Sequence, residues 1–505
     1  MERFKLTLLT AAAGLLIPGA VQAADLPVKA KAIEYVKICS LYGAGFYYIP
    51  GTDTCLKFGG YLRVETALYA GGHYNGQFTG VSAAHNRQTN YYSARSRADL
   101  NIDTRTATEY GVVRTYFDAV QTWTTGSYTG AAGGGTAYST AGAPGAQADG
   151  NIAQGSLGVY FAFIQFAGFT MGRSVSQFDT PWTAYPDNNF DQLVGGGGTS
   201  TGVNQFAYTA DFGQGITASV SAEDTAQYFQ AGNYNLSGAT AGGMIGGSYG
   251  LNNIGGITTP NLVAQLRVNQ AWGLFQASFA AHNNHAGYYG ASELTGHPAD
   301  KWGWAAQLAL SLSNLPTGAG DSVDIQAVYT DGATRYNFQS LAALNYSMYG
   351  STGVAGAYQS IGIASAPDTV FVAGSGQETV RTWGMRGAYT HNWNPYWSTG
   401  LYGAYAQVMY GNLGSAAICA NMTALLALTG TCNPNFNIGQ VGLVTRWVPV
   451  KGLAFSGDLN WSRIDQNYSG TITSPGSVTT AKPAGVYEMK DQNSITLLLR
   501  AQRNW

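Results

Sequence analysis

The stretch SARSRADLNIDTRTA, residues 93–107, decides the fold class because its residues alternate strictly between two kinds. Polar residues take every second position: Arg95, Arg97, Asp99, Asn101, Asp103 and Arg105. The intervening apolar positions are Ala94, Ala98, Leu100 and Ile102. This period of two indicates a β-strand with one wet and one apolar face. A soluble sandwich also alternates, but its polar face does not usually carry six charged or amide residues in succession.

The composition also favours strands in which apolar and neutral polar residues alternate. Charged residues are only 10 % of the chain, against about 25 % in a typical soluble domain. Glycine accounts for 68 of 505 residues and tyrosine for 33, while the mean hydropathy is −0.07. The net charge of −2 and the lack of a basic block give no case for a nucleic-acid partner.

The N-terminus has the features of an export signal. Arg3 and Lys5 precede an apolar run at 6–17, and Val21-Gln22-Ala23 offers a cleavage site. We therefore expect a signal peptide at 1–23, although a membrane anchor has a similar pattern. No later apolar run is long enough for a spanning helix, so an exported chain of this kind indicates a β-barrel in an outer membrane.

Strand patterns continue along the chain and number sixteen. We expect them at 57–69, 93–107, 111–123, 156–166, 169–173, 202–212, 215–228, 260–271, 273–284, 301–313, 322–336, 379–393, 396–410, 435–448, 452–465 and 493–505. Short turns alternate with long connections, which are 70–92, 124–155, 174–201, 229–259, 285–300, 337–378, 411–434 and 466–492. This alternation predicts a sixteen-stranded antiparallel transmembrane β-barrel with short periplasmic turns and long outer loops. The barrel domain is expected at 57–505, after a small periplasmic segment at 24–56.

The four cysteines fall into two close pairs. Their spacing favours two local disulfides, Cys39–Cys55 and Cys419–Cys432, which export makes plausible. No Cys-x-x-Cys is present, so a zinc or redox site is not expected.

Several blocks resemble the alphaproteobacterial general porins of Brucella, rhizobia and relatives. The blocks are ADLPVKA (24–30), CSLYGAGFYYIPGTDTCLKFGGYLR (39–63), FIQFAGFTMGR (163–173) and LLLRAQRNW (497–505). The resemblance implies a homotrimer and a third outer loop that folds into the barrel as a constriction. It also implies that the trimer forms through the early and last strands, with connection 124–155 over a neighbour. The last strand, which ends at Trp505, looks like the signal read by barrel-assembly machinery.

Connection 174–201 is the third outer loop and carries three acids and four consecutive glycines. Asp179, Asp187 and Asp191 oppose arginines expected on the first five strands, namely Arg63, Arg95, Arg97, Arg114 and Arg173. A positive wall facing a negative loop would set a transverse field that favours polar solutes and gives a weak ion preference. The alternative is that the arginines fill the lumen or lie at the interface and the aspartates only cap turns.

An enzyme is the weakest hypothesis. Two Gly-x-Ser-x-Gly matches surround Ser200 and Ser248, but neither lies on an expected strand-to-helix turn. His282 and His285 have a metal-like spacing without accompanying carboxylates, so we expect exposed histidines and no metal or cofactor.

We therefore predict a non-enzymatic outer-membrane channel for passive diffusion of small hydrophilic molecules and ions, in contact with outer-membrane lipid and lipopolysaccharide. The alternatives are a substrate-specific channel, for example for sugars, and a barrel that serves mainly as an adhesin or structural protein.

Overall fold

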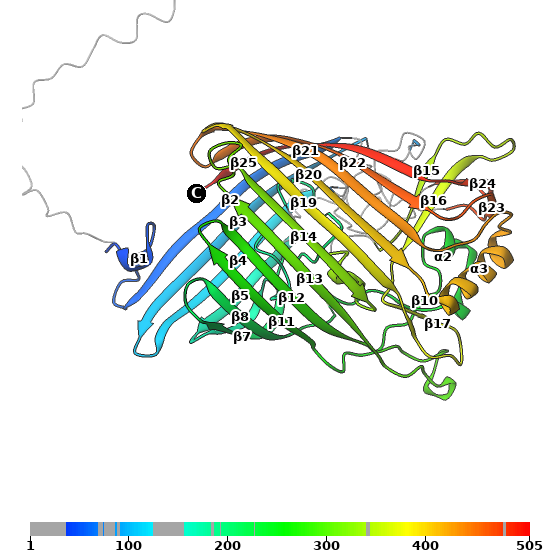
Figure 1. Cartoon of the computed structure of the whole chain (residues 1–505), viewed down its shortest axis with the longest axis horizontal. Helices are drawn as coiled ribbons and strands as arrows, with labels where there is room; N and C mark the ends of the chain where they lie inside the picture. Colours follow the sequence, from blue (N-terminus) through cyan, green and yellow to red (C-terminus); the bar gives the residue numbers. More distant parts are fainter. Residues whose placement is uncertain are drawn as a thin grey trace, which may run out of the picture.

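The sixteen predicted strands form a closed antiparallel barrel. The computed structural model describes residues 37–68, 74, 86–87, 91–124, 156–182, 186–191, 193–226, 228–339, 344–477 and 481–505. The barrel closes because β2 pairs with β3 on one side and with β25 on the other. The strands run obliquely across Figure 1. In chain order they are β2 (Thr54–Leu68), β3 (Tyr92–Thr108), β4 (Gly111–Thr124), β5 (Ser156–Phe166), β6 (Phe169–Ser174), β7 (Val203–Asp211), β8 (Ile216–Glu223), β11 (Asn261–Gln270), β12 (Gly273–Asn284), β13 (Lys301–Ser313), β14 (Ser322–Asp331), β19 (Arg381–Asn394), β20 (Trp397–Met409), β21 (Phe436–Val450), β22 (Leu453–Gln466) and β25 (Gln492–Asn504).

The alternation seen in the sequence separates the two faces of the barrel wall. On β2, Leu62 and Val64 are 54 % and 57 % exposed, whereas Glu65 is 1 % exposed. The same holds for β3, where Leu100 is exposed and Arg95 and Asp99 are buried. An apolar outer face with a polar inner face is the arrangement that lipid outside and water inside require.

Some strand boundaries differ from those expected. The first barrel strand begins at Thr54, three residues early, so Cys55 lies within it. β14 ends at Asp331 rather than at 336, because Gly332 has φ +65° and the next residues form the 3₁₀-helix η6 (Thr334–Tyr336). β8 ends at Glu223 rather than at 228.

The long connections, which were expected as loops, contain strands and helices. They form one sheet from β9 (Asn233–Asn235), β10 (Leu251–Asn252), β17 (Thr369–Phe371) and β18 (Glu378–Thr379). A second sheet combines β15 (Asn345–Gly350), β16 (Gln359–Ser365), β23 (Thr471–Ser474) and β24 (Gly485–Met489). Helices α2 (Ala241–Ile245) and α3 (Asn412–Leu426) accompany them. We call these elements the cap, and Figure 1 shows α2, α3, β15, β16, β23 and β24 at the end of the barrel far from the C-terminus.

Helix α3 is the largest departure from the expectation of loops. Its sequence is rich in the good helix formers Ala, Leu and Met. Gly414, Ile418, Met422 and Leu426 are spaced by four and are all buried, so one face of the helix packs inward. The carboxylate of Glu378 accepts hydrogen bonds from the Leu413 and Gly414 amides at the helix start, at 3.2 and 2.7 Å.

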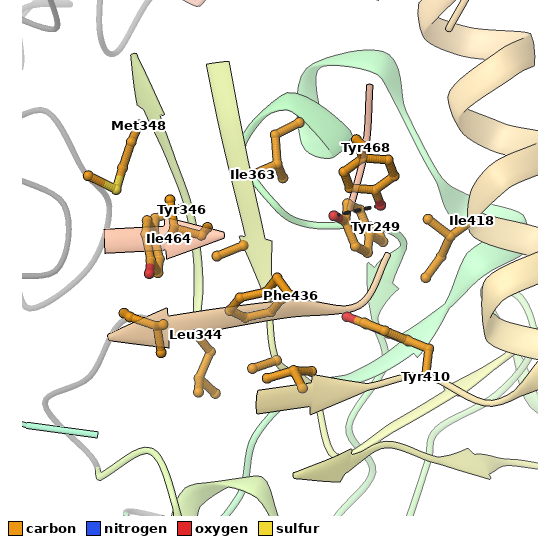
Figure 2. Packing of buried hydrophobic residues seen from close by; sticks show 14 of the residues in the cluster. Tyr249, Leu344, Tyr346, Met348, Ile363, Tyr410, Ile418, Phe436, Ile464 and Tyr468 are labelled. Carbon is orange, nitrogen blue, oxygen red and sulfur yellow. Dashed lines mark hydrogen bonds between the residues drawn. The ribbon is translucent and has the colours of Figure 1, made fainter. Parts of the chain in front are cut away.

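The cap has its own apolar core, which continues onto the inner face of the barrel. Figure 2 shows Ile418 of α3, Phe436 at the start of β21 and Tyr410, which share this core. The Tyr468 hydroxyl donates to the Tyr249 hydroxyl at 2.9 Å within this core (Figure 2). Because residues from five separate connections share one core, the cap folds as a unit with the barrel rather than as independent loops.

Both predicted cysteine pairs are joined. Cys39 is bonded to Cys55 beside β1 (Tyr47–Tyr48), which adds to the edge of β2, and Cys419 of α3 is bonded to Cys432. Among the described residues, no helix is both long and apolar enough to cross a membrane. The predicted signal peptide, residues 24–36 and residues 125–155 of connection 124–155 lie outside the described residues.

Candidate functional site

The segment that joins β6 to β7, residues 175–202, is attached at its base by a buried carboxylate. We call it the β6–β7 segment; it is described except for 183–185 and 192. Glu223 of β8 accepts hydrogen bonds from the Ser176 hydroxyl at 2.6 Å and the Gln177 amide at 2.9 Å. Gln205 of β7 donates to the Val175 carbonyl at 2.7 Å. The inner faces of the two following strands therefore fix how the segment leaves the wall.

Asp179 joins the outgoing and returning arms of this segment. Its Oδ2 accepts hydrogen bonds from the Thr199 amide at 2.5 Å and the Thr199 hydroxyl at 2.6 Å. Its Oδ1 faces Gly197 so closely that a Cβ there would lie 2.5 Å away. Burial raises the pKa of Asp179. The structure thus places Asp179 inside the segment, next to none of the five predicted arginines.

A band of glutamines holds the first half of the segment. Gln276 of β12 donates to the Asp179 carbonyl at 2.9 Å, and Gln307 of β13 donates to the Phe178 carbonyl at 3.0 Å. The Gln326 side-chain oxygen on β14 accepts from Trp182 Nε1 at 2.6 Å. Three adjacent strands therefore bind residues 178, 179 and 182 of the segment through neutral amides.

The returning half of the segment binds the strands further round the barrel. Arg386 of β19 donates to the carbonyl oxygens of Leu193 and Gly197, at 3.1 and 2.5 Å. Gln440 of β21 accepts from the Val194 amide at 3.0 Å. Residues 193–199 are all buried, so this half packs as tightly as a protein core.

Asp187 lies at the wall formed by β19, β20 and β21. It pairs with Arg446 and accepts a hydrogen bond from the Thr390 hydroxyl at 2.6 Å. Asp187 has φ +48°, and its carboxylate occupies the space that a Cβ on Gly400 would fill. The glycine at 400 is therefore needed for the close approach of the segment to β20.

Asp191 pairs with Arg95 of β3, on a different part of the barrel circumference from the partners of Asp187. Arg95 donates to both carboxylate oxygens of Asp191 at 2.7 and 3.0 Å and to Glu65 at 2.6 Å, and its guanidinium stacks 3.7 Å from the Tyr74 ring. Burial alone would raise the pKa of Asp191, but Arg95 and Arg97 outweigh it and the pKa is lowered. Arg500 extends the cluster by binding Glu65 at 2.5 Å and the Asn189 carbonyl at 2.6 Å.

The other four predicted arginines do not meet the three aspartates as side-chain partners. Arg63 and Arg97 are directly opposite each other on β2 and β3. Arg63 donates to Gln502 at 2.7 Å, and Arg97 has no hydrogen-bond or ion-pair partner within the described residues. Arg114 pairs with Asp103 at 3.0 Å near the short turn at the other end of the strands.

Arg173 has a different orientation from the other arginines. The pairing of β6 with β7 places it on the face that carries Phe169, Met171 and the exposed Phe206. Its Nε donates to the Thr201 carbonyl at 2.9 Å, close to the point where the segment rejoins the wall.

Several partners of the segment were not singled out from the sequence. Arg446, Arg500, Arg386 and the glutamines all occupy inner-face positions of expected strands, so alternation would have identified them as facing inward. Nothing in the sequence indicated which of the many inward polar residues meet residues 175–202, because these contacts join residues up to 311 positions apart.

The expectation of exposed histidines is wrong for His282. It is fully buried on the inner face of β12, where Nδ1 lies 2.9 Å from the Asn261 side-chain oxygen. The residue is covered because Asp368, which directly precedes β17 of the cap, packs over this strand end with its carboxylate 3.5 Å from Nε2. His285 lies 2.8 Å from Asp300.

Comparison with known proteins gives a consistent picture. The family model described as "Porin subfamily" matches residues 25–498. Porin Omp2a of Brucella melitensis is 33 % identical over 228 residues, which cover 43 % of this chain and 55 % of that protein. Porin Omp2b of Brucella abortus is 30 % identical over 245 residues, which cover 46 % of this chain and 59 % of that protein. The matched region thus spans somewhat more than half the length of these relatives.

A solved structure supports the fold over most of the chain. The outer-membrane channel DcaP of Acinetobacter baumannii superposes with a TM-score of 0.57 at 14 % identity, and the alignment covers 91 % of this chain and 99 % of that one. At this identity the likeness concerns the barrel fold alone.

Proposed function

Since the chain belongs to the Porin subfamily and forms an outer-membrane β-barrel, we propose that it is a passive diffusion channel for small hydrophilic molecules and ions. It carries out no catalytic step and needs no cofactor. The observation that carries this proposal is the polar inner wall, partly covered by the β6–β7 segment. A barrel whose polar face lines a water-filled interior lets hydrated solutes cross without exposing them to lipid.

The β6–β7 segment is the constriction in this proposal. Its hydrogen bonds reach Gln276 on β12, Asp458 on β22, Arg500 on β25 and Arg95 on β3, which together lie around much of the barrel. Within the described residues it makes no hydrogen bond to β4 or β5. We place the water-filled passage along this uncovered wall, where Tyr116, Asp118 and the neighbouring Arg97 provide the polar lining.

The electrostatics of the proposed passage follow from which charges are already paired. Asp191 is neutralised by Arg95, and Asp187 by Arg446. Among the described residues, Arg63 and Arg97 have no carboxylate within 4 Å, so their positive charge acts on passing ions. The three aspartates contribute to the field mainly by setting the position of the segment and by screening neighbouring cations.

Single-channel recording in planar bilayers tests the proposal. A diffusion channel gives conductance that rises with salt concentration and a reversal potential in a salt gradient. A barrel that acts as an adhesin or structural protein gives no conductance. A substrate-specific channel gives saturable block by one solute. Replacing Asp179, Asp187 and Asp191 together by Asn should shift the ion preference of the channel toward anions. An unchanged reversal potential would show that these residues do not form the constriction.

The proposed function also includes how the chain is placed in the membrane and how it assembles. We place residues 24–56 in the periplasm and 57–505 in the barrel domain. Homotrimer formation through the early and last strands, contact with lipopolysaccharide and recognition of the strand ending at Trp505 by assembly machinery are what the family resemblance implies. Cross-linking of the native protein in outer membranes distinguishes a trimer from a monomer.

A further inference from the structure

A second element besides the β6–β7 segment folds into the barrel. It is the beginning of the connection between β14 and β19, residues 333–338, which contains η6. All of these residues are buried except the half-buried Arg335. Connections ordinarily run over the surface of a protein, so a buried one at this place is held there by specific contacts. We call residues 333–338 the clamp, because they bind both arms of the β6–β7 segment.

The clamp binds the returning arm of the segment through its backbone. The Asn337 carbonyl accepts hydrogen bonds from the amides of Gly195 and Gly196, at 3.1 and 3.2 Å. The Asn337 side-chain oxygen also accepts from the Gly195 amide, at 3.1 Å. Gly196 and Phe338 form a parallel β-bridge. The clamp therefore lies beside the returning arm like a short strand.

The barrel wall leaves space for this contact. Asn337 Nδ2 donates to the hydroxyl of Thr382, a fully buried residue of β19, at 2.9 Å. A Cβ at Gly384 of the same strand would overlap the Asn337 side-chain oxygen and lie 3.0 Å from the Gly195 Cα. A glycine at position 384 is thus required for the clamp and the returning arm to meet against β19.

The clamp holds the outgoing arm through an aromatic stack. The Tyr336 ring lies between Phe178 of the segment and Phe229 of the β8–β11 connection, with centroids 4.5 and 4.3 Å away. None of the three side chains is more than 2 % exposed. The Tyr336 hydroxyl accepts a hydrogen bond from Asn261 Nδ2 at 2.9 Å. Such pairs of buried rings stabilise a contact beyond the area that they bury.

The other side of the clamp is tied to the cap. The Thr334 amide donates to the Asp368 carboxylate at 2.7 Å, and the Thr334 hydroxyl donates to the Pro367 carbonyl at 2.8 Å. These partners directly precede β17. Asp368 also accepts from the Ala231 amide of the β8–β11 connection at 2.6 Å. The outer connections therefore determine where the clamp lies, and the clamp determines where the segment lies.

From these contacts we propose that the clamp sets the width of the passage by holding the β6–β7 segment against the β12–β21 side of the barrel. The inference rests on the proposed function, because the passage is the one along the uncovered wall of β4 and β5. Release of the clamp lets the segment move toward that wall and narrows the passage. Asn337 and Tyr336 are positioning residues, one for each arm of the segment.

Hydrogen–deuterium exchange tests the contact without relying on conduction. The full-length protein is reconstituted in lipid vesicles, and exchange is followed by mass spectrometry over residues 193–199. Asn337→Ala removes the side-chain hydrogen bonds to Gly195 and Thr382. We expect the amides of residues 193–199 to exchange at least about ten-fold faster in this variant. Exchange within about two-fold of the wild type would overturn the proposal.

Two controls separate the clamp from a general loss of stability. Asn421 of α3 donates to the Leu236 carbonyl at 2.9 Å within the cap, so Asn421→Ala removes a hydrogen bond away from the clamp. It should leave exchange at 193–199 unchanged. Gly384→Ala displaces Asn337 from the wall side and should accelerate this exchange, which covers the case in which Asn337→Ala does not fold. Gly439→Ala is its control, because a Cβ there meets nothing within 4 Å.

Single-channel recording tests the consequence for the passage. Tyr336→Leu removes the ring stack, whereas Tyr336→Phe keeps it and loses only the hydroxyl. We expect Tyr336→Leu and Gly384→Ala to spend at least about five-fold more time at conductance levels below that of the wild type. Tyr336→Phe and Gly439→Ala should match the wild type. Wild-type recordings from Tyr336→Leu and Gly384→Ala would refute the proposal. A wild-type protein without conductance would instead refute the proposed function, and the exchange experiment would still decide whether the clamp holds the segment.

Discussion

Replacing Asp191 by Asn should loosen the attachment of the β6–β7 segment to the barrel wall. The wild-type carboxylate is bound through both oxygens by Arg95, and the side chains are 3 % and 0 % exposed. The change removes a buried negative charge and leaves Arg95 with Glu65 as its remaining carboxylate partner. Breaking a buried ion pair typically costs about 3–5 kcal/mol. We take the lower end, about 3 kcal/mol, because Glu65 still compensates Arg95.

The energy should appear in both stability and channel behaviour. A cost of about 3 kcal/mol corresponds to a factor of roughly 150 in the population of a state with the Asn189–Asp191 end detached, since each 1.4 kcal/mol is tenfold. Urea unfolding in lipid vesicles measures the stability change. Planar-bilayer recording measures transitions between conductance levels, which should become more frequent as the segment detaches.

An exposed ion pair provides the control. Arg463 and Asp491 are 3.1 Å apart, and their side chains are 45 % and 41 % exposed. Asp491→Asn should therefore change the free energy of unfolding by about 0.5 kcal/mol or less. If Asp191→Asn costs no more than Asp491→Asn and leaves the recordings unchanged, the assignment of the Arg95–Asp191 pair as the attachment point is refuted.

Acid should reproduce the effect of this replacement. The pKa of Asp191 is lowered in the folded protein, below its ordinary value of about 3.9. A depressed pKa contributes stability that is fully present above the unfolded value and is lost as the pH falls through the folded value. The wild type should thus lose this contribution only below about pH 4, whereas Asp191→Asn should show no such contribution from position 191.

Three further predictions concern the pore, the segment and the cap. Replacing Arg63 and Arg97 by Gln should shift the reversal potential in a salt gradient toward cations, and an unchanged value would place the passage elsewhere. Asp179→Asn should leave the free energy of unfolding in urea at pH 7 unchanged or raise it. Burial raises the pKa of Asp179, so its carboxyl group contributes less to the stability of the folded protein as the pH rises through the folded pKa. A loss above about 1 kcal/mol would show that its charge is required. Reducing the Cys419–Cys432 disulfide should destabilise the cap by about 2–4 kcal/mol and expose α3 to proteolysis, and unchanged protease resistance would contradict this.

Much of the barrel could be predicted from the sequence because each strand carries its own evidence. The alternation at Arg95–Arg105 is a local property, since neighbouring side chains must point to opposite faces. The long and short connections likewise follow from the order of residues along the chain. These features determined the strand number, the antiparallel pairing and the lipid-facing side of the wall.

The partners of the β6–β7 segment were decided only by the tertiary structure. Asp179, Asp187 and Asp191 look alike in the sequence, yet one binds Thr199 within its own segment, one binds Arg446 and one binds Arg95. Barrel closure brings β3, β21 and β25 to the same loop, although they are hundreds of residues apart. Which polar groups then pair depends on depth and distance inside the barrel, quantities that alternation along a strand does not contain.

The cap follows the same rule. Helix α3 buries one face in a core that it shares with residues from four other connections. Which face of the helix is buried therefore depends on how these connections pack together.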